Sequence, residues 1–171
     1  MVLASDLGYR VKRPNAFQRL VQEFASTRFG AWVFARTLRH LDDALGRLTG
    51  GRQSVPELLA GLPVIDVTST GRKSGLRRTT HLISIPTGDT LAVLGTNFGQ
   101  RGTPAWALNL EADPHATLTY RGTTVDVVAR PASEAEYAAV LADSAGVYGG
   151  YLKYVQRISG RRVRIFLFEP V

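Results

Sequence analysis

A short basic turn with a glycine near each end is the part of this sequence best suited to bind an anion. It covers residues 70–78 and runs Thr-Gly-Arg-Lys-Ser-Gly-Leu-Arg-Arg. Gly71 and Gly75 allow positive φ, which can direct several backbone N–H groups toward one point. Charged and hydroxyl donors are added by Arg72, Lys73, Ser74 and Arg78. A phosphate is the natural ligand of this combination, and a plain solvent-exposed connection between strands is the alternative.

The turn does not match the common nucleotide-binding motifs. It lacks the first glycine of a P-loop at the proper distance, and no helix pattern follows it directly. The sequence also contains no dinucleotide fingerprint, so ATP and a Rossmann-bound nicotinamide are disfavoured.

Tyr148, Tyr151 and Tyr154 recur at every third residue. In a helix they would share one face, where phenol hydroxyls could donate a hydrogen bond or a proton to a reacting oxygen. The alternative is that three amphipathic rings pack against the rest of the domain.

Composition excludes several other kinds of site. The absence of cysteine from the 171 residues excludes disulfides, thiolate zinc sites, iron–sulfur clusters and cysteine nucleophiles. The three histidines, His40, His81 and His115, lack partners at metal-ligand spacing, so we predict no metal. No signal peptide pattern or unbroken apolar run of about 18 residues is present. We therefore expect a cytoplasmic protein, at most peripheral on the inner face of the membrane.

The net charge of +7 is concentrated in the first half of the chain. Residues 63–85 hold four basic groups and one acidic group, which gives +3 around the glycine-flanked turn. Such an excess suits nucleic acid, an anionic membrane or a phosphorylated cofactor. Nucleic acid is disfavoured because the sequence lacks a helix-turn-helix, a zinc motif and the RNP aromatics.

Residues 15–48 show apolar positions at helical spacing and predict two helices that are broken near Gly30. The apolar positions are Phe17, Leu20, Val21, Phe24, Phe34, Leu38, Leu41, Leu45 and Leu48. Arginines occupy much of the remaining surface, so these helices either lie on a membrane or form an ordinary amphipathic cover. We assign residues 1–62 to this N-terminal helical extension.

From residue 63 the sequence predicts short strands with turn signals between them. The expected strands are 64–69, 79–85, 90–95, 116–120, 123–129 and 163–168, with helices near 103–113, 133–144 and 150–159. Thr103 is the expected N-cap of the first of these helices, and Ser133 and Glu136 form a capping box for the second. The pattern indicates one compact α+β unit over residues 63–171, a small barrel of six mainly antiparallel strands with helices outside.

Three of these segments together resemble the deazaflavin-dependent nitroreductase family of actinobacteria. They are residues 67–82 around the basic turn, residues 104–110 (Pro-Ala-Trp-Ala-Leu-Asn-Leu), and the three tyrosines with the final Phe-Glu-Pro of residues 168–170. The resemblance implies a split β-barrel oxidoreductase that uses coenzyme F420. His81 and Ala107 depart from the family, which usually has proline and often an aromatic residue there.

The resemblance also implies the site residues. Those expected to hold the cofactor are Arg72, Lys73, Ser74, Arg78, Thr79, Thr80, His81, Leu82, Ile83, Leu94, Gly95, Thr96, Asn97, Ala105, Trp106, Ala107, Leu108, Asn109 and Tyr151. The basic members would bind its phosphate and glutamate tail. Tyr148 and Tyr151, supported by Tyr154 and Thr96, are the candidates for catalysis.

The implied reaction is hydride transfer from reduced deazaflavin to a small organic acceptor, namely a quinone, a conjugated enone or a nitroaromatic compound. Two alternatives remain at this stage. One is a split-barrel enzyme that binds flavin mononucleotide, and the other is a non-enzymatic basic module for membrane or nucleic acid. The sequence does not decide the oligomeric state.

Overall fold

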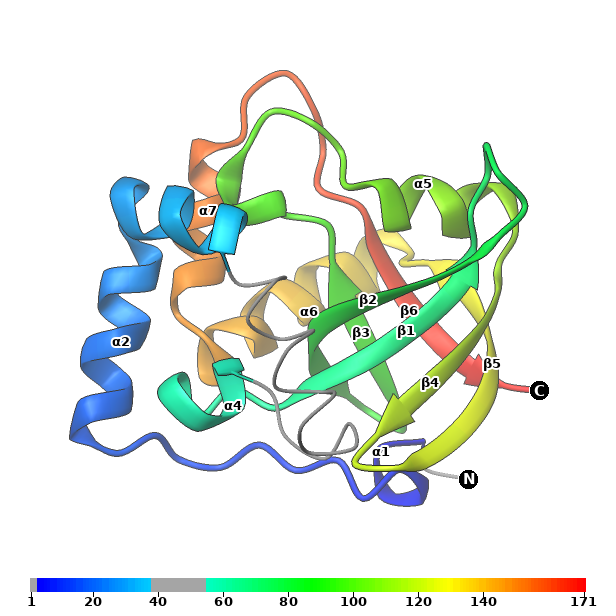
Figure 1. Ribbon diagram of the computed structural model, residues 1–171, viewed down its shortest axis with the longest axis horizontal. Helices are drawn as coiled ribbons and strands as arrows, with labels where there is room; N and C mark the ends of the chain where they lie inside the picture. The colour runs from blue at the N-terminus through cyan, green and yellow to red at the C-terminus, as the bar shows by residue number, and fades with distance from the viewer. Residues whose placement is uncertain (1–2, 38–54) are drawn as a thin grey trace.

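The computed structural model describes residues 3–37 and 55–171, and a closed barrel of six antiparallel strands forms its centre (Figure 1). The strands are β1 Val64–Thr70, β2 Arg77–Thr87, β3 Thr90–Leu94, β4 His115–Tyr120, β5 Thr123–Pro131 and β6 Ile165–Pro170. Their order around the barrel is β1-β2-β3-β6-β5-β4, and β4 pairs back to β1. The predicted α+β barrel of six strands is confirmed.

Alternation along β1 fixes which side chains enter the barrel. Ile65 and Val67 are buried in the core, where large side chains such as Phe166 and Phe168 also pack. Their neighbours in β1 point to the outer face, because successive side chains of a strand lie on opposite sides. Asp66 and its register partner on β2, His81, therefore share the outer face of the barrel.

The first residues of the chain also belong to the core, which the sequence did not predict. The short helix α1, Leu3–Asp6, places Leu3 and Leu7 in the barrel core. The Tyr9 hydroxyl lies 2.9 Å from the carbonyl oxygen of Pro63 and 2.8 Å from that of Ser84. The three apolar residues are too few to form a periodic pattern, so only the packing identifies them.

Two helical segments follow, and the break between them is at Thr27. Helix α2, Ala16–Ser26, begins with a capping box between Asn15 and Gln18, and residues 28–37 are helical. The Thr27 hydroxyl accepts a hydrogen bond from the N–H of Gly30 over 3.0 Å and so caps the second segment. A Cβ at Gly30 would lie 2.0 Å from the Phe24 carbonyl oxygen, which explains the glycine just after the break. The expected helical positions Leu38, Leu41, Leu45 and Leu48 lie outside the described residues.

The remaining helices surround the barrel. They are α4 Val55–Ala60, the short η1 Asn97–Gly99, α5 Ala105–Ala112, α6 Glu134–Val147 and α7 Gly150–Arg157. Figure 1 shows α2, α4 and α7 together on one side of the barrel. The sequence predicted Thr103 as the N-cap of α5, and this prediction is wrong. Pro104 occupies the cap position with φ −63° and ψ 146°, and no side chain caps the helix there.

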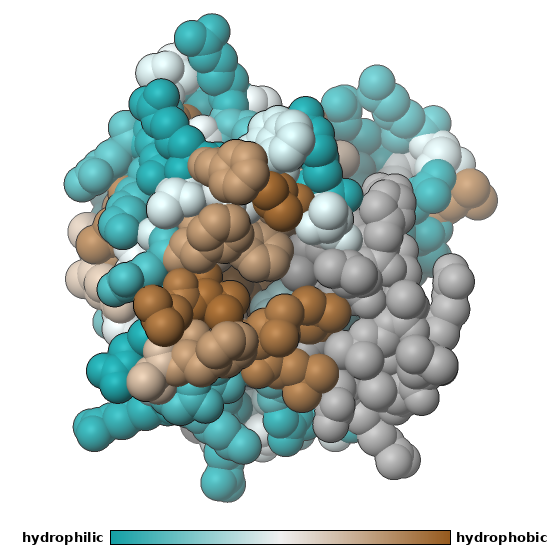
Figure 2. Space-filling model, turned by 60° about the vertical axis from the view of Figure 1, so that its left-hand side comes forward, coloured by the Kyte–Doolittle hydropathy of each residue, from teal (hydrophilic) through white to brown (hydrophobic). Residues whose placement is uncertain are grey.

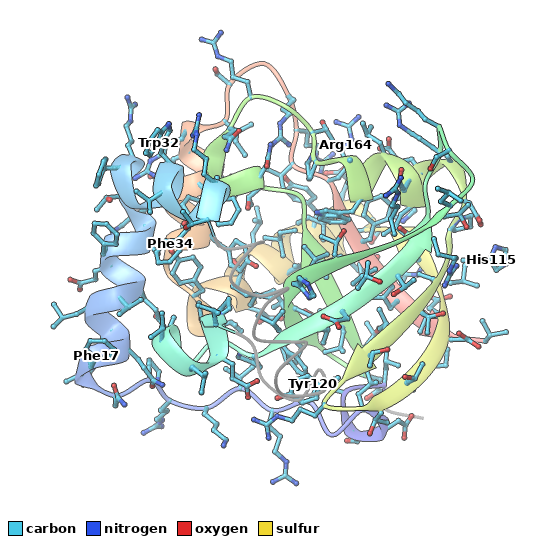
Figure 3. The ribbon with its side chains drawn as sticks, viewed as in Figure 1. Phe17, Trp32, Phe34, His115, Tyr120 and Arg164 are labelled. Carbon is cyan, nitrogen blue, oxygen red and sulfur yellow. The ribbon has the colours of Figure 1, made fainter. Side chains whose placement is uncertain are left out.

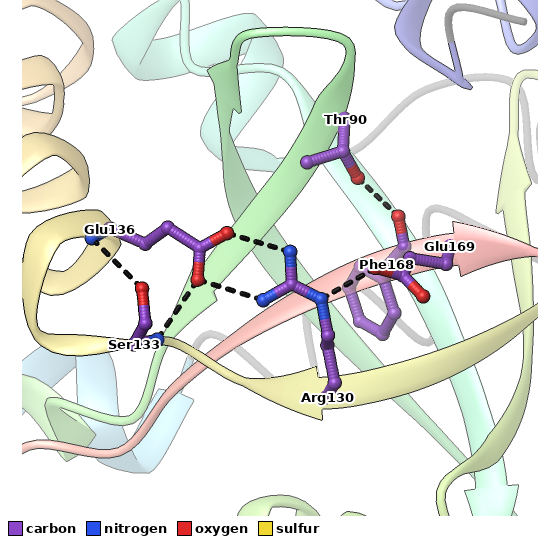
Figure 4. Close-up of polar contacts among 6 residues, drawn as sticks. All are labelled: Thr90, Arg130, Ser133, Glu136, Phe168 and Glu169. Atoms are coloured by element: carbon purple, nitrogen blue, oxygen red, sulfur yellow. Dashed lines mark hydrogen bonds and ion pairs between the residues drawn. The ribbon is translucent and has the colours of Figure 1, made fainter.

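Arg130 joins the start of α6 to two strands (Figure 4). Its guanidinium binds both carboxylate oxygens of Glu136, at 2.6 and 2.8 Å, and its Nε lies 2.5 Å from a carboxylate oxygen of Glu169 on β6. The predicted capping box of Ser133 and Glu136 is confirmed. Glu136 thus caps its own helix while it binds β5 through Arg130.

Candidate active site

A cavity of about 1020 Å³ lies on the outer face of the barrel, bordered by β2 and several helices. The β1–β2 turn lines it, and so do residues of α2 and of the helical segment 28–37. Figure 1 shows this turn and α2 at opposite sides of the molecule. Figure 3 shows Phe34, another lining residue, between the N-terminal helices and the barrel.

The β1–β2 turn supplies the cationic end of the cavity. The N–H groups of Ser74 and Gly75 bond the Gly71 carbonyl at 3.1 and 2.7 Å, and Gly75 has φ +68°. A Cβ at Gly71 would lie 2.9 Å from the Ser74 hydroxyl oxygen and 3.1 Å from the Leu76 carbonyl oxygen, so a larger residue would crowd the turn there. The backbone N–H of Arg72 donates to the Asn109 side chain over 3.1 Å, which fixes the turn against α5.

The cationic side chains of this turn are free to bind an anion. Arg72, Lys73 and Arg78 are exposed and line the cavity, and none of them forms an ion pair within the described residues. Arg77, which the sequence did not nominate, also lines the cavity. Its guanidinium donates to the Thr68 carbonyl at 3.1 Å and to the Thr117 hydroxyl at 3.0 Å.

Thr96 and the start of α5 also line the cavity. Trp106 is buried and packs edge-on against Phe166, with ring centroids 6.1 Å apart. Thr96 is 4% exposed, and its hydroxyl has no hydrogen-bond partner among the residues that the structure describes. It is therefore a buried polar group available to a bound molecule.

The three tyrosines come together at the same cavity. The hydroxyl oxygens of Tyr148 and Tyr154 are 3.0 Å apart, and Tyr154 donates to the Ala25 carbonyl over 2.7 Å. Tyr151 donates to the Ile83 carbonyl over 3.1 Å. Burial raises the pKa of each phenol above its usual value, so all three are neutral at ordinary pH.

His81 lines the cavity from β2 and is oriented by a carboxylate. Its Nδ1 lies 2.6 Å from Asp66 Oδ1, across the register pair already described. The family that the sequence resembles usually has proline at this position. Here His81 instead makes this contact with the neighbouring strand.

Most of the nominated site residues meet at this cavity. Those that line it are Arg72, Lys73, Ser74, Arg78, Thr79, Thr80, His81, Leu82, Ile83, Leu94, Thr96, Asn97, Ala105, Trp106, Asn109, Tyr148, Tyr151 and Tyr154. Three do not line it, namely Gly95, Ala107 and Leu108. Ala107 is fully buried in the barrel core instead, because α5 packs against β1.

Apolar residues of the N-terminal region form a further wall that sequence reasoning missed. They are Val21, Ala25, Phe34, Ala35, Val55, Pro56, Leu59, Ala60, Leu62 and Val64, and Phe98 and Pro104 add to the lining. The helical periodicity identified the apolar side of residues 15–37, but periodicity does not say whether such a side covers a cavity.

Another part of the N-terminal helices carries exposed apolar side chains, which we call the aromatic patch. Its members are Phe17, Leu20, Phe24, Phe29 and Trp32. Leu20 and Phe29 are 67% and 65% exposed, and Figure 2 shows hydrophobic residues gathered on this face. Arg36 stacks on Trp32, with its guanidinium carbon 4.3 Å from the ring centroid. Within residues 3–37 and 55–171, no helix is both long and apolar enough to cross a bilayer.

Comparison with known proteins identifies the enzyme class. The family model for F420H(2)-dependent quinone reductases matches residues 38–170, which is more than half of the chain. The chain belongs to this family. It is therefore an F420-dependent oxidoreductase that transfers a hydride to a small organic acceptor, as the sequence analysis predicted. Coenzyme F420 is the cofactor that membership implies.

Three solved structures share the barrel fold. An F420-H2 dependent reductase, FDR-A, is 24% identical with a TM-score of 0.57, over 63% of this chain and 94% of its own. A structure described as a domain-swapped dimer is 24% identical with a TM-score of 0.59, over 81% of this chain and 98% of its own. A heme binding protein from Mycobacterium smegmatis is 15% identical with a TM-score of 0.50, over 65% and 47% of the two chains.

Proposed function

We propose that the cavity holds F420 with its phosphate and glutamate tail at the β1–β2 turn. The observation that carries this proposal is the set of cations Arg72, Lys73 and Arg78, which line the cavity and form no ion pair within residues 3–37 and 55–171. Their charge suits an anionic tail. The deazaflavin ring would then lie along β2 and Trp106, in the middle of the cavity, where the nominated residues of β2, β3 and α5 line it.

We further propose a quinone, with conjugated enones and nitroaromatic compounds as related acceptors, beside the tyrosine cluster. The wall there is apolar and aromatic, because Val21, Phe34 and Leu59 line the same cavity as Tyr148 and Tyr151. A flat aromatic or conjugated acceptor is the chemistry that such a wall favours. This acceptor class agrees with the name of the family.

The side chains nominated for catalysis have different tasks in this arrangement. Reduced F420 supplies a hydride, and addition of a hydride to a quinone leaves negative charge on an oxygen. Thr96 offers a buried hydroxyl with no partner among the described residues, so it can donate a hydrogen bond to that oxygen. Tyr151 and Tyr154 already donate to backbone carbonyls, so they position and shape the acceptor pocket with Tyr148.

Oxidation of reduced F420, followed at its own absorbance, tests the acceptor. The purified protein would be assayed against matched quinones, enones and nitroaromatic compounds, and we expect the highest kcat/KM with quinones. A parallel titration with flavin mononucleotide should show no tight binding. Tight flavin binding without F420 turnover would contradict the proposed use of this cavity.

We also propose that the aromatic patch rests on the cytoplasmic surface of a membrane. Five large apolar side chains in one region, with Arg19, Arg28 and Arg36 in the same helices, fit the interface between acyl chains and anionic headgroups. Contact with the bilayer would bring lipophilic quinones close to the cavity, since α2 contributes both to the patch and to the cavity wall.

Point variants are the appropriate test of membrane contact, because Leu3 and Leu7 pack in the barrel core and a truncation would remove them. We propose that residues 1–62 and 63–171 fold as one unit for the same reason. The variant Phe29→Glu/Trp32→Glu should lose flotation with vesicles that contain anionic lipid. Leu152→Glu, at an exposed apolar position of α7, is the matched control. Equal flotation of the two variants and the unmodified protein would refute the contact.

A further inference from the structure

The loop after β3 has an unusual backbone where it borders the cavity. Asn97, Phe98 and Gly99 follow one another with φ of 48°, 54° and 78°. Positive φ is unfavourable for residues with a Cβ, so two of these three residues carry a cost that the surrounding structure must offset. The same loop contributes Thr96, Asn97 and Phe98 to the cavity lining.

The side chain of Arg161 binds four backbone carbonyl groups of this loop. Arg161 donates from Nε to the Arg101 carbonyl at 2.8 Å and from Nη1 to the Gly95 carbonyl at 3.1 Å. Its Nη2 donates to the carbonyls of Gln100, at 3.1 Å, and Thr96, at 3.3 Å. The planar fork of a guanidinium suits several carbonyls in one arrangement, whereas a lysine offers a single point charge.

Arg161 differs from the neighbouring arginines in its hydrogen-bond partners. Arg162 binds Glu134 and Arg164 binds Glu111, both as ion pairs. Arg161 has no carboxylate partner among the described residues, and partial burial lowers its pKa. Among the residues that the structure describes, the loop carbonyls are the groups that offset the cost of partly burying this cation.

We propose that Arg161 is a positioning residue, which holds the strained loop so that the Thr96 hydroxyl faces the acceptor. The guanidinium binds the Thr96 carbonyl itself and both ends of the loop. It therefore fixes the backbone on either side of the positive-φ residues. The part played by Thr96 rests on the proposed function, while the fixing of the loop does not.

Trypsin cleavage tests, in the absence of any cofactor, whether Arg161 holds the loop in place. The bond after Arg101 is a trypsin site whose carbonyl is held by Arg161 Nε, and Arg101 is exposed. Loss of these hydrogen bonds should raise loop opening, so Arg161→Gln should speed cleavage at Arg101 by about tenfold or more under native conditions. Arg161→Lys should be intermediate, and Arg162→Gln should cleave there at the unmodified rate. Fragment masses identify the bond, and circular dichroism verifies the fold of each variant.

If Arg161→Gln does not fold, Arg161→Lys alone carries the comparison with Arg162→Gln. Unchanged cleavage at Arg101 in every folded Arg161 variant would overturn the proposal.

Kinetics test whether Arg161 acts through Thr96. We expect Arg161→Gln and Thr96→Val each to lower kcat/KM for the acceptor by about tenfold or more. The double variant should be no worse than the more impaired single variant, because both remove the same contribution. Independent, additive losses would overturn the link to Thr96 even if cleavage is faster. Wild-type turnover of Thr96→Val would instead contradict the proposed function, and the cleavage result would still decide the role of Arg161 in the loop.

Discussion

Tyr154 donates its hydroxyl hydrogen to the backbone carbonyl of Ala25 across 2.7 Å. This bond connects α7 to the last turn of α2. Lys153 and Arg157 of α7 also donate there, to the hydroxyl oxygen and the carbonyl oxygen of Ser26. Tyr154 and Arg157 thus satisfy two carbonyls that the helix itself leaves unpaired at its C-terminal end, and the two cations are favourable there. The N-terminal helix is thus part of the cavity wall and not a separate attachment.

Tyr154→Phe should affect stability more than chemistry. It removes the bond to Ala25 and the contact with the Tyr148 hydroxyl, and we expect a loss of about 1 kcal/mol in the free energy of unfolding. Urea unfolding of Tyr148→Phe, Tyr154→Phe and the double variant would measure their coupling, which should be clearly non-additive. If kcat falls a hundredfold in Tyr154→Phe while stability is unchanged, the hydroxyl acts in the reaction.

Thr96→Val should impair turnover with little change in fold. Valine keeps the shape of threonine and removes only the hydroxyl, which has no partner among the described residues. Loss of one preorganised donor to a developing oxyanion lowers kcat by about 100-fold or more at its strongest, and we expect about 10- to 100-fold here. Steady-state assays with a quinone give this value. Thr119→Val, on the outer face of β4, is the control and should retain normal rates.

Removal of the free cations at the β1–β2 turn should weaken F420 binding. Arg72→Ala and Lys73→Ala are each expected to raise the Kd by about tenfold at low salt, since a charge-assisted hydrogen bond contributes about 1.5–3 kcal/mol. The loss should shrink as salt is added. Fluorescence titration measures the Kd, and Arg10→Ala is the control because Arg10 is exposed and does not line the cavity.

A second titration would use a deazaflavin that lacks the phosphate and glutamate tail. Its affinity should be the same for Arg72→Ala and the unmodified protein, because the missing cation no longer has an anion to bind. An equal loss of affinity for the short and the full cofactor would show that the turn does not hold the tail.

The sequence was most informative where local chemistry decides local structure. The capping box of Ser133 and Glu136 and the barrel strands depend on residues close in the chain, and both are present. In the β1–β2 turn, Gly75 likewise has the positive φ that favours glycine. These features follow from short-range sterics and hydrogen bonds, which a single sequence displays directly.

What the sequence did not predict depends on contacts between distant segments. Leu3 and Tyr9 enter the barrel core through packing against strands more than fifty residues away. Arg161 binds a loop sixty residues before it, and nothing in its neighbouring residues separates it from Arg162 or Arg164. The apolar spacing in α2 likewise did not distinguish Val21, which lines the cavity, from Leu20, which is exposed.

Acidification should weaken the connection between α6 and the barrel. Arg130 lowers the pKa of Glu136 to about 2, and bonds from Ser133 act in the same direction. A carboxylate whose pKa is lower in the folded than in the unfolded chain stabilises the fold above the ordinary pKa of about 4.3. That contribution is lost as the pH falls from there toward 2. Glu136→Gln keeps a capping side chain but has no charge to titrate.

The melting temperature of the unmodified protein should therefore exceed that of Glu136→Gln at pH 7, and the difference should shrink between pH 5 and pH 3. Glu134→Gln is a useful comparison, because Glu134 is highly exposed and Arg162 is its one ion-pair partner within the described residues. Its difference should be smaller at every pH, since an exposed ion pair contributes little. A gap for Glu136→Gln that stays constant down to pH 3 would mean that Arg130 binds the side chain by shape and hydrogen bonding, without a contribution from the carboxylate charge.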